Sequence, residues 1–267
     1  MPPRDPPVAP ILCDKAYGAA SEFTPDSLLR EARRQRGLGA GRVPALCVLD
    51  PDGDIVRHLR ATGVARPDPD WACYHTDLFR FERDGREVGI VGCAVGAPFA
   101  VLVAEQMFAA GCELLISVTS SGQITPSRAP PYFILIEAAL RDEGTSYHYL
   151  APADFAQAPA DLVAAIAPAL SGIGEPVERG MTWTTDAPYR ETRQAIEAAS
   201  ARGILAVEME AAALYAFAQA RGKAVLCFAH VTNQMGQAGD FEKGEANGAT
   251  AALRLVAAAA AAQFARR

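Results

Sequence analysis

The chain has 267 residues, half of them apolar, and a formal net charge of -6 from 25 Lys and Arg against 31 Asp and Glu. This length and apolar content can bury a sizeable core, most simply in one large domain, and the scattered basic residues argue against an extended nucleic-acid surface. The Pro-rich first ten residues lack the organisation of a secretory signal, and we find no apolar run long enough to cross a bilayer. We therefore expect a cytoplasmic protein with no nucleic-acid or membrane partner.

Motifs of metal, nucleotide and covalent chemistry are missing from the sequence. It contains no GxGxxG, GxxxxGK[ST], GxSxG or HExxH pattern, so we expect no metal and no organic cofactor. The cysteines are widely spaced without CxxC pairs, and we expect them to be reduced and mostly buried. They are Cys13, Cys47, Cys73, Cys93, Cys112 and Cys227.

The predicted elements alternate between helices and strands along the chain. After the Pro-rich arm, Thr24 and Pro25 begin a helix that ends at Gly37. In order, we then predict a strand running into a turn over 45–54, a strand over 87–95, a helix over 98–111, a strand over 113–118, helices over 131–144, 158–170 and 188–203, and a strand over 224–231. An Ala-rich helix ends the chain. This alternation predicts an α/β domain with a mainly parallel sheet, covered on both faces, and a ligand site at the carboxyl ends of the strands.

One acidic residue interrupts an apolar pattern. When AVEMEAAALYAFA is read as a helix, Glu210 shares a face with Ala213, Leu214 and Phe217, whereas Glu208 points almost the opposite way. Near the first turn the helix dipole favours a carboxylate, whose oxygens can accept hydrogen bonds from the hydroxyl groups of a ligand. The alternative is a carboxylate that pairs with an arginine in the core or faces solvent at a frayed helix end.

Two turns have residue types suited to binding an anion. Hydroxyl groups and backbone N–H groups of Thr119–Gly122 follow the strand predicted over 113–118, although Ser and Gly are also ordinary loop residues. In DPDGDIVR, Gly53 permits a close backbone approach and Arg57 can donate two hydrogen bonds to a phosphate or carboxylate. For Arg57, and equally for Arg80, the alternative is a surface or ion-paired residue.

Several segments, in order and spacing, resemble the nucleoside phosphorylase family, which includes uridine phosphorylases and hexameric purine nucleoside phosphorylases. They are the Gly53–Arg57 turn, AVGAP, ISVTSSG, TTDAPY and AVEMEAAALYAFA. The similarity runs from about Val43 to about Asn233. It implies a three-layer α/β/α single domain with a central mixed, partly barrel-like β-sheet. We divide the chain into an N-terminal arm and helix, 1–40, and a catalytic domain, 41–267.

The resemblance implies an activity and an assembly. A pentosyltransferase closest to the uridine phosphorylases would cleave the N-glycosidic bond of a nucleoside, with phosphate as co-substrate, to give the free base and pentose 1-phosphate. Such an enzyme serves nucleoside metabolism and nucleotide salvage. Because Arg80 matches an arginine donated to the neighbouring subunit's phosphate, we expect a homodimer or a hexamer built as a trimer of dimers.

The resemblance also assigns roles to individual residues. Phosphate contacts fall to Gly53, Arg57, Arg80 and Ser120. Ribose contacts fall to Met209, Glu210 and Ser120. Base contacts fall to Ser121, Gly122, Tyr189, Arg190 and Asn233. The residues that we expect to be catalytic are Glu210, Arg57 and Asn233.

The sequence departs from the family pattern at the predicted phosphate site. Ser117 stands where the family usually has an arginine, so one phosphate ligand is missing. Either another cation compensates, with Arg128 or Arg190 as candidates, or water replaces phosphate and the enzyme is a nucleosidase. A third possibility is a nucleoside- or base-binding protein without catalysis.

The predicted base site departs from the pattern as well. Asn233 stands where purine-cleaving relatives have an aspartic acid, and an amide can hydrogen-bond a leaving base but cannot protonate it. After Tyr189 the sequence reads YRETRQ, so Arg190, Arg193 and Gln194 are all candidates for the base pocket. Asp186 is expected to cap the next helix rather than to act as the acid.

Overall fold

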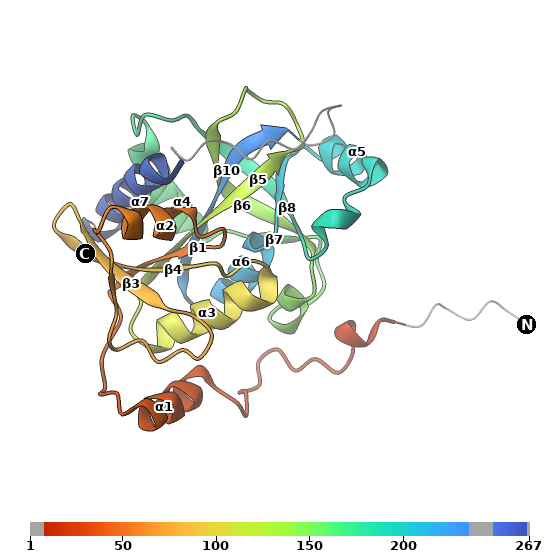
Figure 1. Ribbon diagram of the computed structural model, residues 1–267. Coiled ribbons are helices and arrows are strands. Elements are labelled where there is room, and N and C mark those ends of the chain that lie inside the picture. The colour runs from red at the N-terminus through yellow and green to blue at the C-terminus, as the bar shows by residue number, and fades with distance from the viewer. Residues whose placement is uncertain (1–7, 235–247, 266–267) are drawn as a thin grey trace, which may run out of the picture.

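A computed structural model describes residues 8–234 and 248–265. It shows three layers, with a central β-sheet between two sets of helices (Figure 1). One face is covered by α2 (Asp54–Ala61), α4 (Ala160–Ile166) and α7 (Gly248–Phe264), and the other by α3 (Ala97–Ala109) and α6 (Ala211–Arg221). The predicted three-layer α/β/α class is confirmed. None of the helices within the described residues has the length and apolarity needed to cross a membrane.

The sheet is mixed and partly closed. Its strands are β1 (Leu46–Asp50), β2 (Arg66–Pro67), β3 (Leu78–Arg83), β4 (Arg86–Gly92), β5 (Leu114–Gln123), β6 (Tyr132–Asp142), β7 (Phe155–Gln157), β8 (Val177–Thr185), β9 (Ile204–Glu208) and β10 (Ala224–Gln234). Strands β5, β10, β6, β8 and β9 pair in a closed ring, and β1, β4, β3 and β2 extend it from β5. The β10–β6 and β5–β9 pairs are antiparallel, which corrects the mainly parallel sheet predicted from the alternation of elements.

Parallel pairing places two connections at one edge of the sheet. Strand β1 lies between β4 and β5, parallel to both, and β10 runs parallel to β5. The carboxyl ends of these four strands therefore share an edge, where the β1–α2 turn and the β4–α3 loop also lie. All five residues of β1 are buried, as expected for a strand covered on both faces.

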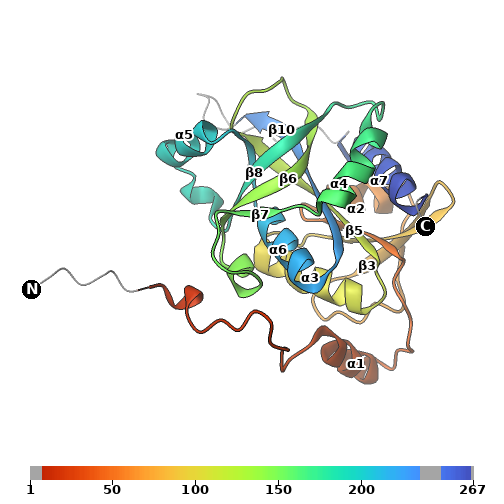
Figure 2. The ribbon, with the colours of Figure 1, turned by 180° about the vertical axis from the view of Figure 1, so that it is seen from behind.

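The first helix follows its sequence signals. Helix α1 (Pro25–Arg36) begins after Thr24, whose hydroxyl oxygen accepts a hydrogen bond from the Ser27 amide at 3.2 Å, and ends at Gly37 with a φ of 65°. The helix packs against α3, outside the three layers (Figure 1). The segment before α1 includes the 3₁₀ turn η1 (Pro10–Leu12), which contacts η2 (Thr145–His148), and Figure 2 shows it passing below α6.

Three predicted helices differ from the structure in whole or in part. The segment 131–144 forms strand β6 rather than a helix. Its YFILIE run is almost wholly apolar and lies inside the barrel sheet, and the hydrophobic periodicity of such a run cannot distinguish a strand from a helix. The segment 188–203 divides into a 3₁₀ turn, η4 (Pro188–Arg190), and the helix α5 (Arg193–Ala201), with Thr192 as N-cap. The segment 158–170 is helical but ends in a 3₁₀ turn, η3 (Ala167–Leu170).

Tyr215 connects α6 to two strands of the ring. Its buried hydroxyl donates to the Ile136 carbonyl at 2.6 Å and accepts from the Cys227 amide at 3.0 Å. Tyr215→Phe leaves both backbone groups without this partner, so we expect the free energy of unfolding to fall by about 1–3 kcal/mol. Urea titration measures the change, with Tyr189→Phe as control because that side chain is exposed. Equal midpoints for the two variants would contradict the expectation.

Candidate active site

The site is built around two buried carboxylates at the junction of β9 and α6. Strand β9 ends at Glu208, and α6 begins only at Ala211, so Glu210 is the N-cap residue rather than a member of the helical stripe predicted for it. Glu210 is 1% exposed and Glu208 is 3% exposed. The expected burial of Glu210 is confirmed, but Glu208 is buried beside it instead of pointing away.

Glu208 is saturated with hydrogen bonds. One carboxylate oxygen accepts from the backbone amides of Glu210 and Ala211, each at 2.7 Å. The other accepts from the hydroxyls of Thr182 and Thr184 on β8. A carboxylate can accept about four hydrogen bonds, so Glu208 has no acceptor position left for a ligand. Its role is to hold the first turn of α6 against β8.

Glu210 receives fewer donors. Its Oε1 accepts from the Gly96 amide at the start of α3 at 2.7 Å, and its Oε2 accepts from the Thr119 hydroxyl of β5 at 2.9 Å. Burial, followed by repulsion from Glu208, raises the pKa of Glu210 from 4.5 to about 8. When Glu210 is ionised, about two acceptor positions on its carboxylate remain for other donors.

A second cluster lies on the opposite side of β5. The Asp52 carboxylate in the β1–α2 turn accepts from the Ser120 amide at 2.7 Å and from the Ser120 hydroxyl at 2.8 Å. The Arg57 guanidinium donates to the Asp52 carbonyl at 2.7 Å and pairs with Asp54 at 2.5 Å. The predicted phosphate residues Ser120 and Arg57 therefore lie together, with a carboxylate of the protein bound to the serine.

Gly53 allows this turn to form. It is the N-cap residue of α2 with a φ of 78°, and a Cβ atom there would lie 2.5 Å from the Cys93 sulfur. The Arg57 guanidinium is 3.8 Å from that same sulfur. The β4–α3 loop thus contacts both clusters, through Cys93 on the Arg57 side and through Gly96 on the Glu210 side.

The TSSG segment is part of strand β5 and not a loop beyond it, which corrects the prediction. Alternation along the strand directs Thr119 toward Glu210 and Ser120 toward Asp52. Ser117 and Ser121 share the Thr119 face, and their buried hydroxyls find no hydrogen-bond partner in the described part of the chain. Polar groups of this kind are normally satisfied, so this face has capacity for a polar ligand or water.

Arg80 is engaged within its own chain. Its guanidinium pairs with Asp68 at 2.6 Å and Glu87 at 2.8 Å, and donates to the Arg42 carbonyl at 2.5 Å. The ion-paired alternative for Arg80 is therefore the one that the single chain shows.

The remaining predicted residues divide between the site and the surface. Gly122 and the half-buried Met209 lie next to Ser121 and Glu210 in the chain. Asn233 lies opposite Gly122 in the β5–β10 pairing, but its side chain is outside the described structure. Tyr189 is 99% exposed and Arg190 is exposed with it, because η4 projects from the domain. The predicted base site is therefore not gathered around Glu210 within one chain.

The candidate replacements for the missing arginine lie elsewhere. Arg128 pairs with Glu178 at 2.9 Å, and Arg190 projects into solvent. Asp186 does not cap α5; its carboxylate accepts from the Gly144 amide at 2.8 Å. All six cysteines are free and four are buried, as expected. No cluster of His, Cys, Asp or Glu within residues 8–234 and 248–265 is arranged to hold a metal ion.

Sequence reasoning missed Asp52, Gly96 and the capping role of Glu208. The signals were present but weak: a second acid two residues before Glu210, threonines at alternate positions of TWTT, and an Asp beside Gly53. Asp52 and Gly96 act through partners far away in the sequence, which no local pattern identifies, whereas Glu208 caps amides two and three residues further along the chain.

The fold is a partly closed mixed α/β barrel that places a buried glutamate at a helix N-terminus beside a glycine-containing loop. The chain belongs to the phosphorylase superfamily, whose family model matches residues 46–263. The relatives are named as phosphorylases, which are pentosyltransferases, and the chain is an enzyme of this type.

Three curated relatives illustrate the range of the family. A uridine phosphorylase from Thermococcus kodakarensis is 29% identical over 187 residues, which is 63% of this chain and 67% of the relative. A guanosine phosphorylase from Halorubrum lacusprofundi is 25% identical over 182 residues, 68% of this chain and 70% of the relative. A DeoD-type purine nucleoside phosphorylase from Colwellia psychrerythraea is 28% identical over 153 residues, 57% of this chain and 65% of the relative.

A solved structure shares the fold. The crystal structure of a uridine phosphorylase from Vibrio fischeri ES114, complexed with 6-hydroxy-1-naphthoic acid, superposes with a TM-score of 0.68 at 22% identity. The match covers 84% of this chain and 93% of that chain.

The raised pKa of Glu210 predicts a pH dependence of stability. Between pH 4.5 and about 8 the folded protein binds more protons at this group than the unfolded chain does, so the free energy of unfolding falls as pH rises. The contribution of Glu210 to the free energy of unfolding is complete below pH 4.5 and is lost by about pH 8. Between these values the free energy of unfolding falls by up to about 1.4 kcal/mol per pH unit. Glu210→Gln should flatten the curve.

Urea unfolding between pH 5 and 8 compares the two proteins. Glu197→Gln, at an exposed position of α5, is the matched control and should keep the wild-type slope. If Glu210→Gln also keeps that slope, Glu210 does not carry the raised pKa.

Proposed function

We propose that this protein cleaves the N-glycosidic bond of a nucleoside and transfers the pentosyl group to phosphate, giving the free base and pentose 1-phosphate. The observation that carries the proposal is the difference between the two buried carboxylates. Glu208 accepts four hydrogen bonds from the described residues, whereas Glu210 accepts two. The spare acceptor capacity of Glu210 suits the two adjacent hydroxyls of a ribose.

The Asp52 cluster supports an anionic acceptor at Ser120, the residue of β5 that follows Thr119. The Ser120 amide and hydroxyl already hold a carboxylate next to Arg57, so these donors form an anion site. In this proposal Asp52 is a placeholder that phosphate displaces. Phosphate can make the same hydrogen bonds and adds charge-assisted contacts to Arg57.

The reaction needs no covalent enzyme intermediate. Departure of the base builds positive charge on the sugar, and the Glu210 carboxylate lies where it would hold the hydroxyls of that ring. Adjacent residues of β5 then position both reactants close together, with Thr119 bound to Glu210 and Ser120 at the anion site. Phosphate is the co-substrate, and we propose no metal or organic cofactor.

The assembly belongs to the same proposal. Tyr189 and Arg190, expected at the base, project into solvent from η4, and a neighbouring subunit is one way to bring such residues to a site. The homodimer or hexamer expected from the resemblance therefore remains our proposal. The relatives act, by name, on uridine, guanosine and purine nucleosides, and no contact in the described residues selects among these bases.

Hydrolysis is a second candidate, favoured by a specific observation. Asp52 occupies the Ser120 donors, Asp54 pairs with Arg57, and Ser117 replaces the arginine that the family usually has. An acidic environment of this kind disfavours a phosphate dianion and suits a water molecule polarised by a carboxylate.

Glu210→Ala should reduce base release on the order of 100-fold, because the sugar hydroxyls lose their acceptor as positive charge develops on the ring. Purified protein is incubated with uridine, guanosine, inosine and adenosine, with and without phosphate, and the products are quantified by chromatography. Glu197→Ala is the matched control and should keep wild-type rates. Wild-type rates in Glu210→Ala would remove Glu210 from the site.

The variant Asp52→Asn distinguishes phosphate from water as the acceptor of the pentosyl group. If Asp52 is a placeholder, removing its charge should lower the KM for phosphate on the order of tenfold, because phosphate no longer competes with a negative group. If Asp52 activates water, the same change should instead abolish base release in the absence of phosphate. Asp161→Asn, exposed on α4, controls for the loss of one surface charge. An unchanged KM for phosphate would contradict the placeholder role.

A further inference from the structure

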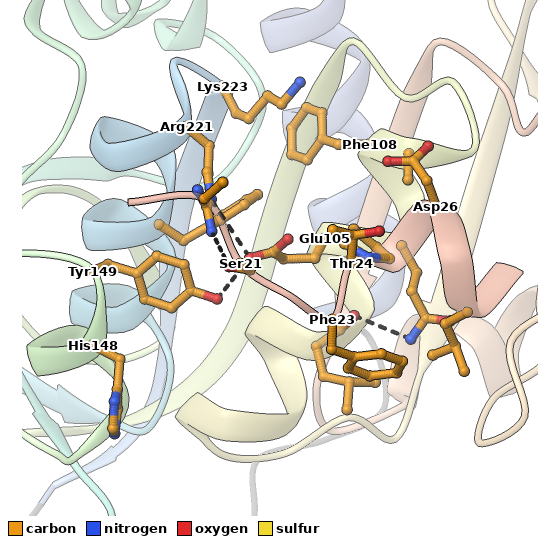
Figure 3. Close-up of a pocket in the computed structure, with 17 residues that line it drawn as sticks. Ser21, Phe23, Thr24, Asp26, Glu105, Phe108, His148, Tyr149, Arg221 and Lys223 are labelled. Atoms are coloured by element: carbon orange, nitrogen blue, oxygen red, sulfur yellow. Dashed lines mark hydrogen bonds and ion pairs between the residues drawn. The ribbon is translucent and has the colours of Figure 1, made fainter. Parts of the chain in front are cut away.

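A cavity of about 840 Å³ lies between the N-terminal segment and two helices of the domain. Its walls are residues 20–28, the middle and C-terminal part of α3, and the C-terminal part of α6 (Figure 3). The family model begins at residue 46, so one wall is made by a segment outside the family match. The cavity therefore includes a surface that the family model does not describe.

The cavity is separate from the Glu210 site. Helices α3 and α6 reach Glu210 with their N-terminal ends, whereas Phe108 and Arg221 lie near their C-terminal ends. At 1.5 Å per residue, the 11 residues of α6 put its two ends about 16 Å apart. The cavity and the proposed active site thus lie at opposite ends of the same two helices.

The floor of the cavity is aromatic. The rings of Phe108 and Tyr149 lie 5.8 Å and 5.9 Å, centroid to centroid, from the ring of Phe217. Leu102 adds an aliphatic side chain that is partly exposed. Such a surface suits the flat, apolar body of a small molecule, and the volume falls within the 300–1,000 Å³ typical of ligand sites.

Two cations border this aromatic floor. The Arg221 guanidinium lies 5.9 Å from the centre of the Tyr149 ring, and the Lys223 ammonium lies 5.5 Å from the centre of the Phe108 ring (Figure 3). No carboxylate in the described part of the chain pairs with Lys223, and Arg221 approaches Glu105 only at 3.9 Å. The Glu105 carboxylate itself accepts from the Tyr149 hydroxyl at 2.7 Å. Asp26, on α1, is the other carboxylate that lines the cavity.

We propose that this cavity binds a small aromatic anion, whose ring packs on Phe108, Tyr149 and Phe217 and whose carboxylate or phosphate pairs with Arg221 and Lys223. The segment 20–28 forms the outer wall and closes over the ligand. The Arg221 guanidinium already contacts this wall, 3.3 Å from the Ser21 hydroxyl, so binding connects the N-terminal segment to α6.

The test uses 1-naphthoate, a two-ring carboxylate, and the full-length protein. Isothermal titration calorimetry measures its affinity for the wild type and for the Arg221→Ala/Lys223→Ala double variant, with 1-naphthalenemethanol as the neutral probe of matched shape. We expect the double variant to bind 1-naphthoate at least tenfold more weakly, and to bind the neutral probe as the wild type does. Arg202→Ala/Arg179→Ala, which removes two exposed arginines elsewhere, should not weaken binding.

A second variant fills the cavity without removing charge. Leu102→Trp should also weaken 1-naphthoate binding, and hydrogen exchange of residues 20–28 should slow in wild type when the probe is bound. Equal affinity of the wild type and the double variant for 1-naphthoate would overturn the proposal. So would the absence of binding at millimolar 1-naphthoate, or hydrogen-exchange protection confined to residues around Glu210. These readouts do not depend on nucleoside cleavage, so a failure of this proposal is distinguishable from a failure of the proposed activity.

Discussion

The structure depends on placing two carboxylates, Glu208 and Glu210, side by side in the protein interior. Burying a charge without partners is costly, and four neighbouring elements supply donors to the pair. Strand β8 provides two threonine hydroxyls, α6 provides the amides of its first turn, α3 provides the Gly96 amide and β5 provides Thr119. The closed ring of strands and the two helices of one layer thus converge on a single pair of side chains.

Strand β5 then divides the site into two halves. Because successive side chains alternate between the faces of a strand, Thr119 and Ser120 serve different partners although they are neighbours in the sequence. One half, at Glu210, has spare hydrogen-bond acceptors, and the other half, at Ser120, has donors occupied by Asp52. In the reaction that we propose, the sugar lies at Glu210 and the nucleophile at Ser120, and the charge of the β1–α2 turn selects the nucleophile.

Local signals in the sequence predicted local structure well. Thr24, Pro25 and Gly37 mark both ends of α1, and the resemblance located the mixed barrel and the buried Glu210. Sequence reasoning failed where tertiary contacts decide: the YFILIE run is a strand because the ring of strands surrounds it, and Glu210 is an N-cap because Glu208 fixes where α6 begins. Asp52 could not be foreseen, because its partner Ser120 is 68 residues away in the sequence.

The most direct test of the account identifies the atom that attacks the sugar. A nucleoside that the protein cleaves is incubated with phosphate, and phosphorus NMR follows inorganic phosphate in the same sample in which base release is quantified. We predict that one molecule of pentose 1-phosphate forms, and one phosphate is consumed, for each base released. Release of base while the inorganic phosphate signal stays constant would contradict it and would assign the attack to water.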